Sequence, residues 1–142
     1  MARRRYETVT IVSTYESSSD LSSAPSVEGK AVTFAVERHG ARVILSVSGE
    51  IDMVTAPGLQ EELVRLLSEP VEILVVDLSK VDFFASAGLS ALVVGYQLAE
   101  QQQAKLRVVA TNSATIRPLQ ITALDRRIPI CDTREQALKP EF

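Results

Sequence analysis

The pattern of apolar and polar positions predicts a chain that alternates strands with helices. Residues 32–36 alternate between apolar and polar or small side chains, as a strand with one buried face does. The turn-forming stretch 38–41 separates them from a second strand at 43–47, so these two strands should form an antiparallel hairpin. The run at 73–76 is apolar throughout, which is typical of a central strand covered on both faces.

Helices are expected between the later strands. Leucines over 59–67 recur at helical spacing and form one apolar face, which Thr55 can cap and Pro70 ends. A second helix follows the turn at 83–90. The remaining elements are expected to be strands at 106–110 and 128–131 and helices at 115–123 and 133–138. This order predicts an α/β fold with a mainly parallel central sheet, an antiparallel edge hairpin and about four helices.

Two prolines constrain the last elements. Pro118 would break the interior of a helix, but with Thr115 as N-cap it falls among residues whose N–H groups have no intrahelical partner. Pro129 cannot donate a hydrogen bond to a sheet, so the strand at 128–131 is expected at an edge.

Residues 1–28 are expected to form a disordered tail ahead of a single domain at 29–142. Serine-rich stretches in this tail bury too little apolar surface to offset the entropy lost on ordering. A short strand over 8–12 is an alternative, because that stretch is rich in β-branched residues. The arginines near the start are not followed by the apolar stretch of a signal peptide, and no run reaches the roughly 20 apolar residues of a membrane helix. We therefore expect neither secretion nor a membrane span.

Composition narrows the classes of function. The formal net charge of −3 argues against a direct nucleic-acid partner. A single cysteine excludes an intramolecular disulfide and fits a cytoplasmic protein, and with only one histidine besides it, a zinc site is not expected. We expect Cys131 to be a buried structural thiol rather than a redox switch, and His39 to be an ordinary turn residue. No cofactor or metal is expected.

Catalytic motifs are missing from the sequence. It contains no GxGxxG and no phosphate-binding loop, and the one histidine argues against a Ser-His-Asp arrangement. Asp77 and Asp82 either form a carboxylate pair, as a hydrolase would need, or hydrogen-bond the amides of a turn, which we favour. We therefore expect a binding protein and not an enzyme.

The turn from Phe83 to Ser90 is the most informative segment. It follows a strand expected to end at Asp77, and its small residues would let another backbone approach closely. Ser86 is expected to be the N-cap of the next helix, whose N-terminus carries a partial positive charge. One phenylalanine of the pair at 83–84 should face the core. This turn is either a docking site or only a tightly packed connection.

The segment 76–90 resembles the signature of the STAS domain family, which includes bacterial anti-sigma factor antagonists. The stretch 49–56, Gly-Glu-Ile-Asp followed by Thr-Ala, also resembles that family, and the likeness spans about 32–138. The resemblance implies a STAS-type fold and a bacterial cytoplasmic protein that binds an anti-sigma factor of the serine-kinase type and so releases a sigma factor. It implies no cofactor, and it leaves a homodimer open. The partner-binding residues that it implies are Asp52, Thr55, Phe84, Ala85, Ser86, Ala87, Gly88, Leu89 and Ser90.

One departure from the family pattern concerns its phosphate switch. The family accepts phosphate on the second serine of Asp-Ser-Ser-Gly, and here Ala87 holds that position, after Ser86 and Ala85. Three outcomes are open: phosphate on Ser86, an antagonist that phosphate does not switch, or a protein that kept the fold and lost the role. The alternative function is a STAS-type regulatory module that binds a nucleotide or a transporter subunit.

Overall fold

The computed structural model describes residues 7–15 and 30–140 of the chain. Its centre is a six-stranded sheet in the order β1-β2-β3-β4-β5-β6. The strands are β1 (Glu7–Tyr15), β2 (Lys30–His39), β3 (Arg42–Ile51), β4 (Ile73–Phe84), β5 (Lys105–Val109) and β6 (Ile130–Cys131). The first three are antiparallel, and β3 to β6 run parallel. This confirms the expected mainly parallel sheet with an antiparallel hairpin.

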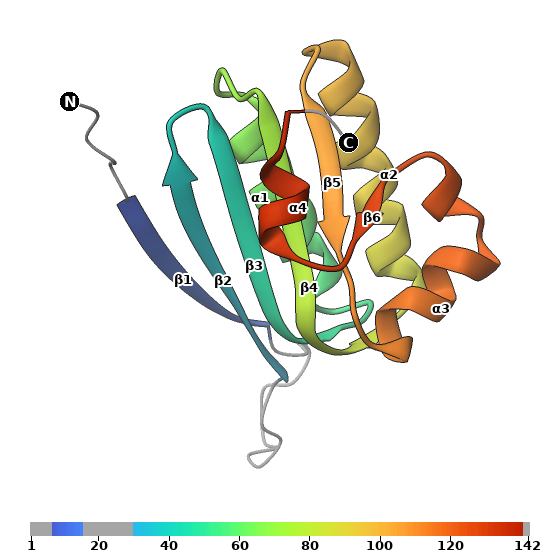
Figure 1. Cartoon of the computed structure of the whole chain (residues 1–142). Helices are drawn as coiled ribbons and strands as arrows, with labels where there is room; N and C mark the ends of the chain where they lie inside the picture. Colours follow the sequence, from blue (N-terminus) through green and yellow to red (C-terminus); the bar gives the residue numbers. More distant parts are fainter. Residues whose placement is uncertain (1–6, 16–29, 141–142) are drawn as a thin grey trace.

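Four α-helices connect or follow the strands. They are α1 (Ala56–Leu67), α2 (Ser86–Gln101), α3 (Ser113–Ile121) and α4 (Arg134–Leu138), with a short 3₁₀ turn at Leu124–Arg126. Helices α1 and α2 lie on one face of the sheet and α4 lies on the other (Figure 1). The sheet is therefore covered on both sides around β4 and β5, as the apolar run at 73–76 predicted.

Alternating residues of β4 divide the core in two. Leu74 and Val76 pack with the leucines of α1 and with β2 in the larger cluster. Ile73 and Val75 point to the other face, where they pack with Cys131 and the small cluster beneath α4. Because consecutive strand residues face opposite sides, a wholly apolar run is what such a central strand requires.

Three local expectations were wrong. Strand β4 does not end at Asp77 but continues to Phe84, since β3 stays paired with it through two register shifts. Ala85, not Ser86, is the N-cap residue of α2. Asn112, not Thr115, caps α3 by accepting a hydrogen bond from the Thr115 amide, so Pro118 lies inside that helix. An Asn N-cap satisfies the same free amides that a Thr would, one turn earlier.

The expected tail also needs a correction. Residues 7–15 of that range form β1, in antiparallel register with β2 from Glu7 opposite Arg38 to Tyr15 opposite Lys30. The alternative of a strand over 8–12 is the one that the structure supports. The rest of the expected tail lies outside the described residues, and the boundary at residue 29 stays a prediction.

Candidate functional site

Two segments that are distant in sequence lie side by side at one end of the sheet. The loop between β3 and α1 follows Ile51, and the junction between β4 and α2 follows Phe84, which pairs with Ile51 across the parallel ladder. The Ala85 amide donates to the Ile51 carbonyl at 2.9 Å. The sheet therefore joins the two stretches in which the family resemblance was found, and it fixes their spacing.

Thr55 holds the first segment from inside. Its side chain is fully buried, and its hydroxyl donates to the Glu50 carbonyl at 2.8 Å and accepts from the Asp52 amide at 2.9 Å. The Asp52 carboxylate in turn accepts from the Val54 amide at 2.9 Å and the Thr55 amide at 3.0 Å. Thr55 was expected to contact a partner, but its burial shows that it shapes the loop instead.

The second segment is packed just as closely. Phe84 is only 4% exposed, and Gly88 is buried against it, because a Cβ at Gly88 would lie 2.8 Å from both Phe84 Cε1 and Ile51 Cγ2. Phe84 and Gly88, which were expected to bind a partner, are therefore buried in the structure and hold the turn together. As expected, one phenylalanine of the pair faces the core, and Phe83 is the one that is exposed.

Apolar side chains stand in solvent on both segments. Met53 is 76% exposed, Phe83 51% and Val54 42%, although large apolar residues are usually buried. Ser86 and Ser90 on the first turns of α2 are exposed as well. We call these four exposed residues, Met53, Val54, Phe83 and Ser86, on the two segments that the Ile51–Phe84 pairing joins, the docking surface. Met53 and Val54 were not among the residues expected at the site, and the signal for them in the sequence is an apolar pair directly ahead of a helix cap.

The remaining residues of the expected partner-binding set differ in accessibility. Asp52 is partly exposed, and its carboxylate is engaged in the loop. Ala85, Ala87 and Leu89 are half-buried. Ala87 is the second residue of α2 and has no hydroxyl to carry a phosphate, whereas Ser86 precedes it on the exposed side.

Asp77 is structural in this arrangement. Its carboxylate accepts from the Ser79 amide at 2.9 Å and from Arg134 Nε at 2.7 Å. Burial alone would raise the pKa of Asp77, but these hydrogen bonds outweigh it and lower the pKa below its ordinary value. A carboxyl that ionises so readily is a poor general acid. Asp82 is exposed on β4.

Other candidate groups also have structural surroundings. Cys131 is buried in β6, and burial raises the pKa of its thiol, which keeps it protonated. His39 Nε2 lies 3.0 Å from Glu37 Oε2 at the end of β2. Among the described residues no group of three or more His, Cys, Asp and Glu side chains is placed to hold a metal ion. In the same part of the chain no helix combines the length and apolarity that crossing a membrane requires.

Comparison with known proteins identifies the family. Residues 33–137 match the STAS domain family, and the chain belongs to it. The anti-sigma-F factor antagonist RsfB of Mycobacterium tuberculosis is 36% identical over 107 residues, which cover 75% of this chain and 87% of that protein. The anti-sigma-B factor antagonist of Listeria monocytogenes is 31% identical over 94 residues, which cover 66% of this chain and 82% of that protein.

Solved structures agree with this family. The crystal structure of an anti-sigma factor antagonist from Mycobacterium paratuberculosis has a TM-score of 0.71 and 40% identity, over 82% of this chain and 95% of that one. The unphosphorylated anti-sigma factor antagonist SpoIIAA has a TM-score of 0.64 at 15% identity, over 73% of this chain and 91% of that one. The second likeness shows the STAS-type fold alone.

Proposed function

We propose that this protein is an anti-sigma factor antagonist, which binds an anti-sigma factor through the docking surface and so releases a sigma factor for transcription. The relatives named above are antagonists of this kind. The observation that carries the proposal is the exposure of Met53, Val54 and Phe83 on two segments that the sheet holds together. Large exposed apolar side chains at one end of a sheet are typical of protein interfaces.

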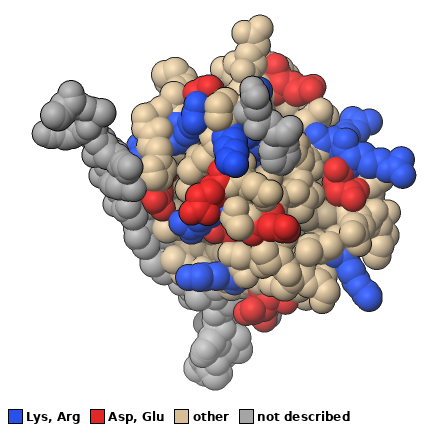
Figure 2. Space-filling view, viewed as in Figure 1, with Lys and Arg blue, Asp and Glu red and all other residues tan. Residues whose placement is uncertain are grey.

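The chemistry of the docking surface fits a protein partner better than a small substrate. Its apolar side chains supply buried area, while the exposed Ser86 and the free amides of the α2 N-terminus supply hydrogen-bond donors at its edge. Acidic and basic residues are interspersed on the face drawn in Figure 2, which is not the single-sign surface of a nucleic-acid binder. The proposal therefore describes a binding protein without catalytic activity.

The partner in this proposal is a serine-kinase type of anti-sigma factor in the cytoplasm, where sigma factors act. We also propose that phosphate does not switch this protein off, because Ala87 stands at the position where the family accepts phosphate. Control would then depend on the partner or on the amount of protein. None of the relatives named above is described as a nucleotide-binding or transport module, so we do not favour that alternative.

The test compares two exposed apolar residues. Phe83→Ser should weaken binding to the cognate anti-sigma factor by about 10- to 100-fold, the usual effect of removing an aromatic residue from the centre of an interface. Ile121→Ser is the matched control, because Ile121 is 80% exposed at the end of α3 and outside the docking surface. Calorimetry on both variants measures the affinities, and native mass spectrometry of the mixtures detects the complex.

Two results would contradict the proposal. One is an equal affinity for Phe83→Ser and Ile121→Ser, since the docking surface would then not be the interface. The other is the lack of a complex with every kinase-type anti-sigma factor of the same cell. Calorimetry with nucleotides tests the alternative function, which requires that this protein binds a nucleotide tightly.

A further inference from the structure

The outer edge of β5 is only partly covered. Strand β6 pairs with it only at Val108 and Val109. The Lys105 amide donates to the Glu72 carbonyl, toward β4, whereas the Val108 amide donates to the Pro129 carbonyl, toward β6. The main-chain groups of successive strand residues point alternately to the two neighbouring strands. The N–H and C=O of Leu106 therefore point to the β6 side.

Proline ends the ladder at this point. The residue opposite the Leu106 carbonyl on the β6 side is Pro129, which has no N–H to donate. Among the described residues none pairs with the Leu106 main chain at this edge. Ahead of β6, Leu106 is therefore the residue of β5 whose main-chain groups face this edge.

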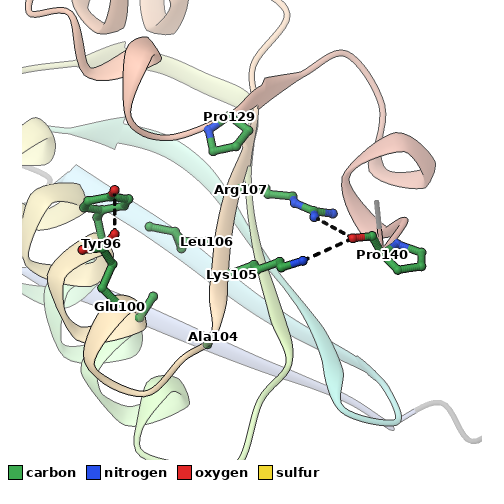
Figure 3. Close-up of a pocket in the computed structure, with 9 residues that line it drawn as sticks. Tyr96, Glu100, Ala104, Lys105, Leu106, Arg107, Pro129 and Pro140 are labelled. Carbon is green, nitrogen blue, oxygen red and sulfur yellow. Dashed lines mark hydrogen bonds between the residues drawn. The ribbon is translucent and has the colours of Figure 1, made fainter. Parts of the chain in front are cut away.

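A cavity of about 440 Å³ lies along this free edge (Figure 3). Its first wall comes from α2 and the core side of β5, with Tyr96, Ala99 and Leu106. The second wall holds Lys105 and Arg107, whose side chains point to the opposite side, toward Pro140. We call this cavity the β5 slot. Its two walls differ in character, and they flank main-chain groups that are set to extend a sheet.

The second wall is positively charged. Lys105 Nζ donates to the Pro140 carbonyl at 3.3 Å, and Arg107 donates to the Ala137 carbonyl at 2.8 Å. A carbonyl has no net charge, and within residues 7–15 and 30–140 no carboxylate forms an ion pair with the exposed Lys105 ammonium. The first wall is mainly apolar, and its one carboxylate, that of Glu100, accepts a hydrogen bond from the Tyr96 hydroxyl at 2.9 Å.

We propose that the β5 slot binds a short extended peptide of a partner protein, which adds to the edge of β5 as a strand. Its main chain pairs with Leu106, its apolar side chains face α2, and its alternate acidic side chains face Lys105. Strand addition of this kind derives affinity from main-chain hydrogen bonds and specificity from the pockets for alternate side chains. The charge of the second wall selects an acidic peptide over a basic one.

The β5 slot is separate from the docking surface. The docking surface adjoins the N-terminus of α2 at Ser86, and the slot adjoins its last turns near Glu100. At 1.5 Å per residue these points lie roughly 20 Å apart along the helix. The inference therefore does not depend on the proposed function, and both surfaces can be occupied at once.

The test uses the full chain, labelled with ¹⁵N, and the probe peptide acetyl-Val-Glu-Val-Glu-Val-amide. Binding should shift the amide signals of Leu106 and its neighbours. At a peptide concentration about ten times Kd, hydrogen exchange of the Leu106 amide should slow by about tenfold, because only the free form exchanges. A peptide of the same sequence with N-methylated amides should not bind, since it lacks the donors that a strand needs.

Charge variants complete the test. Lys105→Glu should weaken binding of the acidic peptide by about threefold or more, and Lys80→Glu, which makes the same charge change on β4 outside the slot, should not. Equal binding of the N-methylated peptide would overturn the proposal, as would an unshifted Leu106 signal at millimolar peptide. Slow exchange of Leu106 that depends on protein concentration without peptide would point to a second copy of the chain and would also overturn it.

Discussion

Arg134 in α4 donates from Nε to the Asp77 carboxylate at 2.7 Å and so ties the last helix to the middle of β4. The same guanidinium donates to Ser46 Oγ at 2.7 Å and to Glu37 Oε1 at 3.3 Å. One side chain thus joins α4 to β2, β3 and β4, on the face of the sheet opposite α1 and α2. The small core cluster beneath α4, which includes Ala137, lies on this face of the sheet.

Removing this contact should destabilise the fold. Arg134→Ala leaves the nearly buried Asp77 carboxylate with one partner fewer, and we expect a loss of about 1–2 kcal/mol, less than for a fully buried pair because Arg134 is partly exposed. Arg65→Ala, which removes the surface pair with Glu62, is the control and should cost less than about 0.5 kcal/mol. Urea unfolding measures both; an equal loss in the two variants would contradict the role of Arg134.

The Asp77 carboxylate also makes the stability of the fold depend on pH. Its pKa is lowered in the folded protein, so its contribution to stability is complete above the ordinary value of 3.8 and is lost as the pH falls through the lower folded-state pKa. Asp77→Asn should therefore unfold more easily than the wild type at pH 7, with the difference shrinking toward pH 3 and below. Urea midpoints across this range test the sign, and a gap that widens in acid would contradict it.

The sequence predicted the order of strands and helices because apolar periodicity is a local signal. It could not predict where β4 ends. Asp77 looks like the end of an apolar strand, yet β4 continues because β3 follows it, with Gly49 at a φ of +111° near the register shifts. The cap of α3 was misplaced for a similar reason, since Asn112 and Thr115 are both good caps and only the fold selects between them.

The candidate site was predicted in outline only. The sequence located both segments, and it indicated that one phenylalanine of the pair faces the core. It could not show that Thr55 is fully buried, because a threonine ahead of a helix looks like an accessible cap. It also missed Met53, since an apolar residue next to a helix is more often part of the core. Exposure depends on the tertiary contacts, and no local pattern encodes it.

The Thr55 hydroxyl should be needed for the shape of the first segment. Thr55→Val keeps the volume but leaves the Glu50 carbonyl and the Asp52 amide without the hydroxyl they share. We expect a loss of about 1–3 kcal/mol, the usual cost of unsatisfied buried polar groups. Thr122→Val is the control, because water can replace its exposed hydroxyl. If both variants unfold at the same urea concentration, the hydroxyl of Thr55 is not structural.

Gly88 should be sensitive to a single methyl group. Gly88→Ala places a Cβ 2.8 Å from both Ile51 Cγ2 and Phe84 Cε1, and such overpacking typically costs about 1–3 kcal/mol. The higher helix propensity of alanine offsets at most about 1 kcal/mol of this. Ser90→Ala, at an exposed position on the same helix, should be close to neutral. Thermal or urea unfolding measures the stability of both variants. A Gly88→Ala variant as stable as the wild type would show that the turn has room to relax.

Ala87 gives the sharpest test of the proposed lack of a phosphate switch. Ala87→Ser restores a hydroxyl at the second residue of α2, where the family accepts phosphate, and a cognate kinase-type anti-sigma factor with ATP should add one phosphate to it. The wild type should gain none and should keep its affinity, whereas phosphorylated Ala87→Ser should lose it, because about −1.5 to −2 charges enter the interface. Intact mass and calorimetry measure the two effects, with Ser86→Ala in both backgrounds as the control. A phosphate on the wild type that disappears in Ser86→Ala would show that the acceptor has moved by one residue, and the protein would then be switched after all.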